Sequence, residues 1–336
     1  MNTKIFSKTA FLLIVTSWCP WAISQQYIVD GPVHVETFPF RLEPIGEEIG
    51  LTVPKCICTS STVLPPAGAF RLIDEMNFFL AVDGSKQPQD FGVNANLGGQ
   101  VSVNAGIPIL SEYGIGTQFG TGLTASSNAV RVYELLGEST GRTQSFTTIG
   151  LFQRMDNGLS WGFVYDFLSE KSFDTFQLGQ WRLRGSYLLN PTNEIGVFCA
   201  LKSYSDNGIF GSNTNVTLSP INQGSLFCRH FWGTGAQTTG WVGIAEKHGE
   251  NNAVTGPSPN QELPFLFGAD VLMPLTASLA IYGETNMIMP SDTGTVDAFL
   301  GLQWFPGKRS FTARRRQYSP LMSLASPTNF SVDLSQ

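Results

Sequence analysis

The sequence offers few residues for acid–base or nucleophilic chemistry. Its three histidines are His34, His230 and His248, and only His230 falls on an expected strand. A hydrolase site needs a serine, a histidine and an orienting group that converge in space. Ser225 and His230 lie five residues apart on one strand, so their side chains point to opposite faces. No phosphate-loop, His-Glu-x-x-His or calcium-loop pattern occurs. We therefore expect no enzyme, no metal site and no other cofactor.

Polar side chains on one face of the expected strands are better candidates for a role with solutes. Arg182 and Arg184 share a face with Gln180, while Asp270 and Glu284 lie on neighbouring expected strands. Acidic and basic groups on different walls of a lumen would set a transverse field and tune the passage of ions and solutes. Alternatively, these groups form ion pairs that fill a closed lumen. The candidate lumen-lining residues are Asp166, Gln180, Arg182, Arg184, Asp270, Glu284 and Asp297.

Two cysteines form a candidate disulfide. Cys199 and Cys228 lie on expected strands that flank the loop 204–224. Residue 199 is expected opposite residue 228, where facing Cβ atoms are ~4.5–5.5 Å apart. Because exported proteins reach an oxidising space, we predict a bridge that clips the base of this loop. Two free cysteines are the alternative.

The elements that would position these residues are strands. From Asn77 onward, apolar and polar residues alternate with period two, as in the run 159–168. The run 91–109 keeps the same apolar parity across Gly98 and Gly99, so we expect one long strand that bends there. The twelve expected strands are 77–83, 91–109, 114–126, 144–154, 159–168, 174–189, 194–203, 225–232, 237–246, 263–273, 278–288 and 295–305.

The connections between the expected strands alternate in length. Short turns at 155–158, 190–193, 233–236 and 274–277 alternate with longer connections at 127–143, 169–173, 204–224, 247–262 and 289–294. Membrane barrels have short turns at one end and long loops at the other, whereas a sandwich has no reason to sort its loops.

Composition agrees with a membrane barrel. The 336 residues are 14 % charged and 12 % aromatic, yet no apolar run of ~18 residues could form a spanning helix. Only helices and closed barrels can cross a bilayer. We therefore predict an all-β fold, a closed antiparallel up-and-down transmembrane β-barrel of about twelve strands. A secreted β-sandwich is the alternative. The net charge of −6 argues against nucleic acid as a partner.

The chain divides into four predicted segments. Residues 1–24 have the basic start, apolar stretch and small-residue cleavage site of a signal peptide. An N-terminal extension (25–76) precedes the barrel (77–305). A basic C-terminal tail (306–336) then follows, for which the simplest interpretation is a solvated periplasmic extension. The alternatives are a contact with an anionic surface and a segment that plugs the lumen.

Several glycine-led motifs resemble an uncharacterised family of expected outer-membrane β-barrel proteins known from planctomycetes. They include Phe79-Leu-Ala-Val-Asp-Gly84, Thr148-Ile-Gly-Leu-Phe-Gln-Arg-Met-Asp-Asn-Gly158 and Ser319-Pro-Leu-Met-Ser-Leu-Ala-Ser-Pro327. The resemblance covers about residues 77–336 and implies a barrel in the bacterial outer membrane, with its lipid bilayer as partner. It implies no activity and no catalytic residues.

Two functions fit these features. The first is a porin-like channel for passive passage of small polar solutes, and oligomers are possible. The second is a non-conducting outer-membrane barrel whose long loops serve as a surface scaffold or adhesin. Occupancy of the lumen distinguishes them, because an open polar lumen favours the channel and a filled lumen favours the scaffold.

Overall fold

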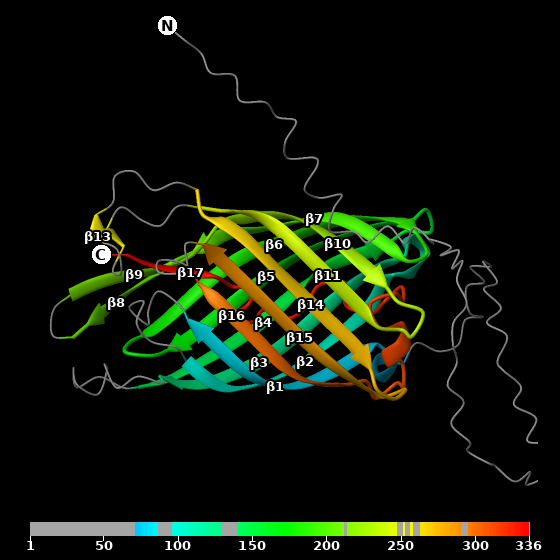
Figure 1. The fold of residues 1–336 in the computed structure, drawn as a ribbon, viewed down its shortest axis with the longest axis horizontal. Helices are drawn as coiled ribbons and strands as arrows, with labels where there is room; N and C mark the ends of the chain where they lie inside the picture. The colour runs from blue at the N-terminus through cyan, green and yellow to red at the C-terminus, as the bar shows by residue number, and fades with distance from the viewer. Residues whose placement is uncertain are drawn as a thin grey trace, which may run out of the picture. The chain divides into compact units, whose positions relative to one another are not determined.

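Twelve antiparallel strands close into a barrel in the computed structural model of this chain (Figure 1). The predicted signal peptide and most of the predicted N-terminal extension lie outside the described residues. The residues that the structure describes are 71–86, 96–128, 140–211, 214–246, 251–252, 256–257, 263–289 and 295–335.

All twelve predicted strands are confirmed, with ends that differ by a few residues. A short 3-10 helix, η1 (Leu72–Glu75), precedes the first strand. Each strand pairs with its neighbours around the barrel, and the first closes on the last. The barrel strands are β1 (Met76–Lys86), β2 (Asn96–Leu110), β3 (Ile115–Asn128), β4 (Gly141–Arg154), β5 (Leu159–Lys171), β6 (Thr175–Asn190), β7 (Asn193–Tyr204), β10 (Gln223–Phe231), β11 (Gln237–Ala245), β14 (Phe265–Pro274), β15 (Leu279–Met289) and β16 (Val296–Trp304).

The period-two pattern divides each strand between the outside and the inside of the barrel. On β16, Leu300 is 61 % exposed on the outside, whereas Asp297 is fully buried on the inside. The predicted bend in β2 leaves the strand continuous, since Gly98 and Gly99 pair with Ser126 and Ala125 of β3. The part of that prediction before residue 96 lies outside the described residues. Neighbouring backbones are therefore paired around the whole wall.

Tight turns join the strands at one end of the barrel. At 155–158 the Gly158 amide donates to the Met155 carbonyl, with a positive φ of 88° at the glycine. At 190–193 the Asn190 side chain accepts from the following backbone amides. We call this the turn end and the opposite one the loop end. The prediction of a longer connection at 169–173 is wrong, because β5 and β6 extend until only residues 172–174 join them.

A second sheet lies at the loop end and was not predicted. It contains five strands in the order β13-β12-β17-β9-β8. Four of them come from two long connections, and the fifth comes from the C-terminal tail. Their bounds are β8 (Asp206–Phe210), β9 (Thr214–Pro220), β12 (Asn251–Asn252), β13 (Gly256–Pro257) and β17 (Val332–Ser335).

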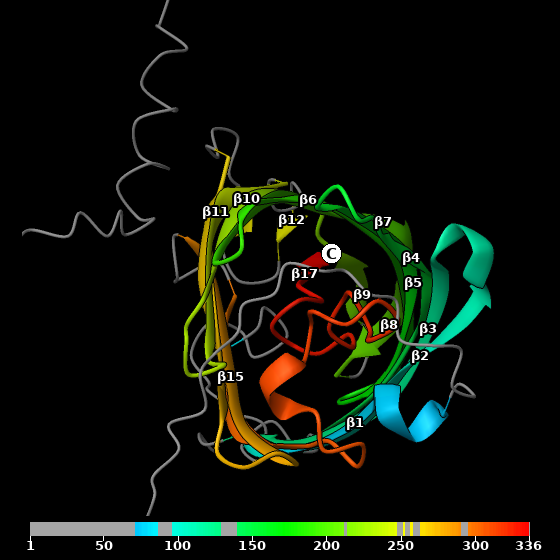
Figure 2. The same ribbon diagram turned by 90° about the vertical axis from the view of Figure 1, so that its right-hand side faces the viewer.

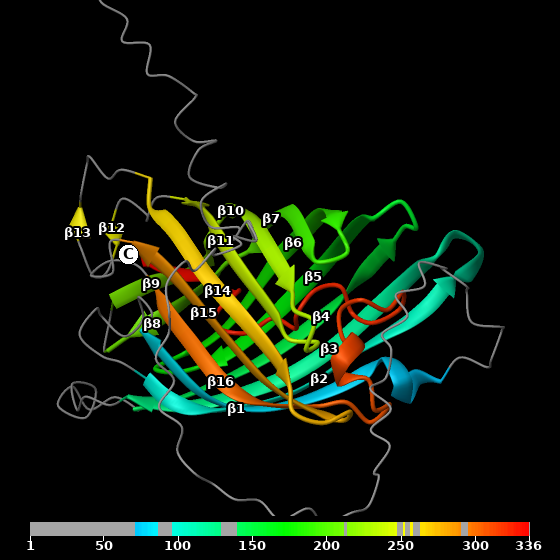
Figure 3. The ribbon, with the colours of Figure 1, turned by 45° about the vertical axis from the view of Figure 1, so that its right-hand side comes forward.

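The C-terminal tail runs through the inside of the barrel. It leaves β16 at the turn end, forms a short 3-10 helix, η4 (Ser310–Thr312), and finishes as β17 at the loop end (Figures 1 and 3). Viewed along the barrel, it lies within the ring of strands (Figure 2). Phe330 and Leu334 are 1 % and 0 % exposed. The interpretation of the tail as a solvated extension is therefore wrong, because its apolar side chains are buried against the wall.

The tail and the wall share hydrophobic cores. Near the loop end, Phe330 and Val332 pack with Phe146 and Leu178 of the wall and with Leu218 of β9. A second cluster joins tail residues to the middle of the wall; its buried members are Phe152, Val164, Leu321 and Met322. Burying each of these large side chains contributes ~1.5–3 kcal/mol, so the tail is part of the folded core.

The predicted Cys199–Cys228 disulfide is wrong. Cys199 is a free thiol. The β7–β10 register pairs Cys199 with Gly224 and Cys228 with Ile195, so the two cysteines lie at different levels of the hairpin. Four residues of strand separate those levels by about 13 Å, which no disulfide can span.

None of the helices in the described part of the chain is long and apolar enough to cross a membrane.

Candidate functional site in the barrel lumen

All seven candidate lumen-lining side chains lie on the inner wall. Five of them are buried: Asp166, Gln180, Arg182, Glu284 and Asp297. The side chains of Arg184 and Asp270 are each 9 % exposed. The structure therefore gathers the set on one surface, as the strand parity requires, but six of the seven face tail residues or one another instead of open water.

Asp166 and Arg182 form the centre of a buried network. Arg182 makes two contacts with the Asp166 carboxylate, including Nη2 to Oδ1 at 2.9 Å. Gln180 and Thr148 also donate to this carboxylate, at 3.0 and 2.6 Å. Arg182 also contacts the tail, because its Nη2 donates a hydrogen bond to the Ser323 carbonyl at 2.9 Å.

A second ionic group contains two residues that the sequence analysis missed. Glu194 accepts from Arg184 at 2.9 Å and from Arg229 at 3.1 Å, so one carboxylate serves two guanidinium groups. Arg184 also donates to the Leu321 carbonyl of the tail at 3.3 Å. Glu194 and Arg229 occupy inward positions of β7 and β10. The alternation of inward and outward positions along these two strands could have predicted that Glu194 and Arg229 face the lumen.

The acidic wall opposite also contacts the tail. Asp270 pairs with Arg314 of the tail at 2.8 Å. Glu284 accepts from the Thr328 hydroxyl at 2.6 Å and from Tyr282. Tail side chains therefore occupy the space that the transverse field would cross in an open pore.

Wall side chains also bind the tail through its backbone. Met322 is held at both polar groups: its amide donates to Gln118 Oε1 at 3.1 Å, and its carbonyl accepts from Asn104 and Gln118. Arg154 donates hydrogen bonds to three backbone carbonyls of the tail, those of Gln317, Ser319 and Pro320. These bonds fix the position of the segment along the barrel.

Glycines on the inner wall leave room for the tail. A Cβ atom built on Gly106 of β2 would come within 1.9 Å of the Tyr318 carbonyl oxygen. On β3, Cβ atoms at Gly120 and Gly122 would come within 2.8 and 2.7 Å of the Leu324 side chain. The inward positions of β3 that carry glycine therefore leave space in which the Leu324 side chain of the tail packs against the wall.

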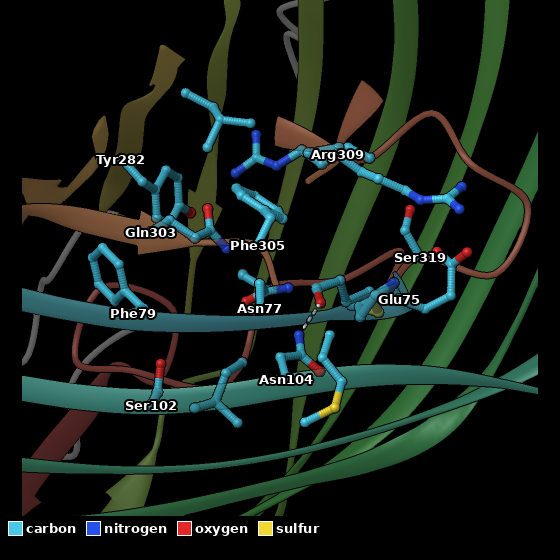
Figure 4. A pocket seen from close by; sticks show the side chains of 18 of the residues that line it. Glu75, Asn77, Phe79, Ser102, Asn104, Tyr282, Gln303, Phe305, Arg309 and Ser319 are labelled. Carbon is cyan, nitrogen blue, oxygen red and sulfur yellow. Dashed lines mark hydrogen bonds between the residues drawn. The ribbon is translucent and has the colours of Figure 1, made fainter. Parts of the chain in front are cut away.

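Two cavities lie beside the tail. The first, of about 80 Å³, lies between the tail and strands β1, β2, β15 and β16 (Figure 4). The second, of about 100 Å³, lies between the tail and the strands that carry Arg184, Arg229 and Trp241. In the described part of the chain the tail therefore occupies the middle of the lumen, and these two spaces lie beside it.

Ser225 and His230 do not converge. Ser225 is 9 % exposed on the inner face of β10. His230 lies on the outer face, where its Nδ1 is 2.8 Å from Asn193 Oδ1 and its ring meets Trp232 edge to face. The parity argument for this pair is therefore confirmed.

Glu75 is a titratable group at the turn end, before the first barrel strand. Burial raises the pKa of its carboxyl from an ordinary value near 4.5 to about 7, although the positive charge of Arg309 opposes the shift. Arg316 of the tail forms an ion pair with it. Arg309 pairs with the neighbouring Asp74 at 2.8 Å.

The raised pKa of Glu75 predicts a pH dependence of stability. The folded protein binds this proton more tightly than the unfolded chain, so the contribution of Glu75 to stability is greatest below pH 4.5 and is lost as the pH rises through 7. The loss attributable to Glu75 is at most roughly 3 kcal/mol. Urea unfolding in detergent at pH 5 and pH 8 measures it. In Glu75→Gln the difference between the two pH values should shrink, and an unchanged difference would contradict this origin.

Comparison with known proteins places the chain in a family. Residues 75–332 match the model of a family of unknown function, DUF6666. The chain belongs to this family. The DUF6666 match begins at the end of η1 and ends in β17, so it includes the barrel and nearly all of the tail inside it. Membership agrees with the resemblance to an uncharacterised family. No curated protein matches the sequence.

Solved structures similar to this DUF6666 protein are outer-membrane β-barrels. The β domain of the Bordetella autotransporter Brka has a TM-score of 0.43 at 10 % identity, covering 69 % of this chain and 100 % of its own. The KdgM porin has a TM-score of 0.38 at 8 % identity, covering 68 % and 98 %. Outer membrane phospholipase A from Escherichia coli has a TM-score of 0.38 at 12 % identity, covering 72 % and 94 %. Similarity this distant carries no conclusion about activity.

Proposed function

We propose that this protein is a bacterial outer-membrane barrel that its own tail closes, and that it serves as a non-conducting scaffold for the structure at its loop end. The observation that carries the proposal is the course of the tail, which begins at the turn end and pairs with β9 at the loop end. A segment that traverses the lumen and contributes to its cores would obstruct an aqueous path through the barrel.

The outer surface supports a position in a membrane. Apolar side chains such as Leu80, Val101 and Leu300 are more than half exposed there. A soluble barrel would pay a large hydration cost for such a surface, whereas lipid solvates it. Aromatic residues gather near the turn end, as expected at a bilayer interface; the exposed ones there include Phe78, Tyr113, Tyr187, Trp232 and Trp304.

The loop-end sheet is the part that such a scaffold would present. Its central strand is the tail strand β17, which pairs with β9 over four residues and with β12 at Ser335. Strands from two loops are therefore joined through the end of the tail. The part of the tail inside the lumen therefore also anchors this sheet to the barrel wall.

An epitope-accessibility experiment tests this orientation and display. A short peptide tag inserted after Gly211, in the β8–β9 turn, should bind antibody on intact cells. The same tag inserted at Asn157, in a turn-end loop, should bind antibody only after the outer membrane is permeabilised. Labelling of the Asn157 tag on intact cells, or protection of the Gly211 tag, would contradict the proposal.

A porin-like channel for small polar solutes is the second candidate. The two cavities beside the tail favour it, because polar wall side chains such as Gln100 and Gln223 line them. In this function the tail must move before solutes pass. Arg182, Arg184, Asp270 and Glu284 would then lose their tail contacts and face the pathway.

A further inference from the structure

The cavity on the β1–β2 side has the chemistry of a ligand site. Three successive inward positions of β2 carry Gln100, Ser102 and Asn104, and all three line this cavity, together with Asn77 of β1 and Gln303 of β16. Amide and hydroxyl groups both donate and accept hydrogen bonds. The wall thus offers a dense array of neutral polar groups.

Several polar atoms of the lining have no partner in the protein. Four lining residues each keep one buried side-chain atom without a hydrogen bond: Glu75 Oε2, Gln100 Oε1, Asn104 Oδ1 and Arg316 Nη1. Native proteins leave few such atoms, because each costs about 1–3 kcal/mol when it is buried without a partner. Their gathering around one cavity indicates that water or a ligand satisfies them.

An aromatic surface faces these polar groups. Phe79, Tyr282 and Phe305 lie together on one side of the cavity, and Glu75, Arg309 and Ser319 lie on the other (Figure 4). Phe79 and Tyr282 contact each other edge to face, with ring centroids 5.4 Å apart. Aromatic rings of this kind can pack against the C–H groups of a ligand whose hydroxyl groups point toward the polar side of the cavity.

The charges around the cavity are matched within the protein. Each arginine of the lining pairs with a carboxylate: Arg309 with Asp74, Arg314 with Asp270, and Arg316 with Glu75. With Glu75 ionised, these three pairs leave no net charge to attract an ion. An uncharged ligand that both donates and accepts hydrogen bonds fits this lining better than an anion or a cation.

We propose that this cavity binds a small neutral polyol of about the size of glycerol, which enters from the turn end. The volume of about 80 Å³ holds several water molecules, since one needs ~10–15 Å³ on this measure. Asp74 and Arg309 are partly exposed where the cavity reaches the turn end. The site does not depend on whether the barrel conducts, since it is complete with the tail in place.

Saturation-transfer NMR on the full-length protein in detergent tests the site, with ethylene glycol, glycerol and erythritol as probes. At least one probe should bind with a Kd in the range of about 1 mM. Gln100→Leu removes an unpartnered acceptor and should weaken binding at least about tenfold, a loss of ~1.4 kcal/mol. Ser102→Leu fills the cavity without removing a buried amide and should also weaken binding, so the test survives if Gln100→Leu fails to fold.

Gln223→Leu is the matched control. Gln223 and Gln100 are each 7 % exposed, and each has an unpartnered Oε1, but Gln223 lines the second cavity. This control should bind the probes as the unaltered protein does. The proposal is overturned if no probe binds, if Gln223→Leu weakens binding as much as Gln100→Leu, or if an ethylammonium probe binds more tightly than every polyol.

Discussion

Replacing Arg182 by leucine is expected to lower the free energy of unfolding by about 3–5 kcal/mol, because the substitution leaves Asp166 buried without its counter-charge. Arg182 is 1 % exposed and Asp166 is fully buried, so water cannot compensate for the lost partner. The tail loses the bond from Arg182 to the Ser323 carbonyl in the same step. Urea unfolding of the refolded protein in detergent measures the change.

Two further variants separate the cost of an isolated charge from general damage to the wall. In Arg182→Leu/Asp166→Leu both charges are gone, and most of the lost stability should return. Lys202→Leu removes the Lys202–Glu246 pair, whose side chains are 44 % and 38 % exposed, and should cost at most about 1 kcal/mol. Equal losses in all three variants would contradict the argument.

Replacing Gly106 by leucine is expected to displace the tail from the wall. A Cβ atom at this position would lie 1.9 Å from a backbone oxygen of Tyr318, so the tail must shift as a whole. Overpacking of this kind costs ~1–3 kcal/mol and raises the population in which the tail is undocked. Trypsin should then cut at Arg314, Arg315 and Arg316 at least about tenfold faster.

Gly99→Leu is the control for this substitution. Gly99 lies on the same strand, faces outward, and meets only one atom, the Ala81 carbonyl oxygen at 3.6 Å. Its cleavage rate should match that of the unaltered protein. Unchanged cleavage in Gly106→Leu, with the barrel still folded, would show that the tail does not rest against β2.

The strand pattern was readable because the two environments of a barrel wall differ so much. Lipid requires apolar side chains at every second position, and the inner face accepts polar ones, so parity on β16 or β3 indicates both strand and face. The same alternation predicted that Asp166, Arg182 and Glu284 line the lumen, since these charged residues occupy the polar positions of strands whose other positions are apolar and face lipid.

The predictions failed where the tail packs. Strands 144–154 and 225–232 alternate poorly because Phe146, Phe152, Phe227 and Phe231 face inward, where an open polar lumen would have no use for them. Phe146 contacts Phe330 of the tail, with ring centroids 6.1 Å apart. An inward aromatic residue on a membrane strand thus marks a packed lumen, and this signal was present in the sequence.

The tail itself was hard to place from its sequence. Its arginines 314–316 resemble a solvated basic segment, and the serine-rich stretch 319–331 has no strand or helix periodicity. Side chains far away in the sequence, such as Gln118 and Arg154, hold the tail in place. The residue pattern within the tail does not indicate such long-range contacts. Similarly, the β7–β10 register that separates Cys199 from Cys228 depends on residues 205–222, which form strands of their own.

Single-channel recording in a planar bilayer tests the central claim, that the tail closes the lumen. The full-length mature protein should show no steady conductance. The same barrel without residues 313–336, verified as folded by its β-sheet circular dichroism, should conduct, because the pairing of β1 with β16 still closes the wall and the segment that crosses the lumen has been removed. Steady conductance of the full-length protein equal to that of the shortened one would contradict the account.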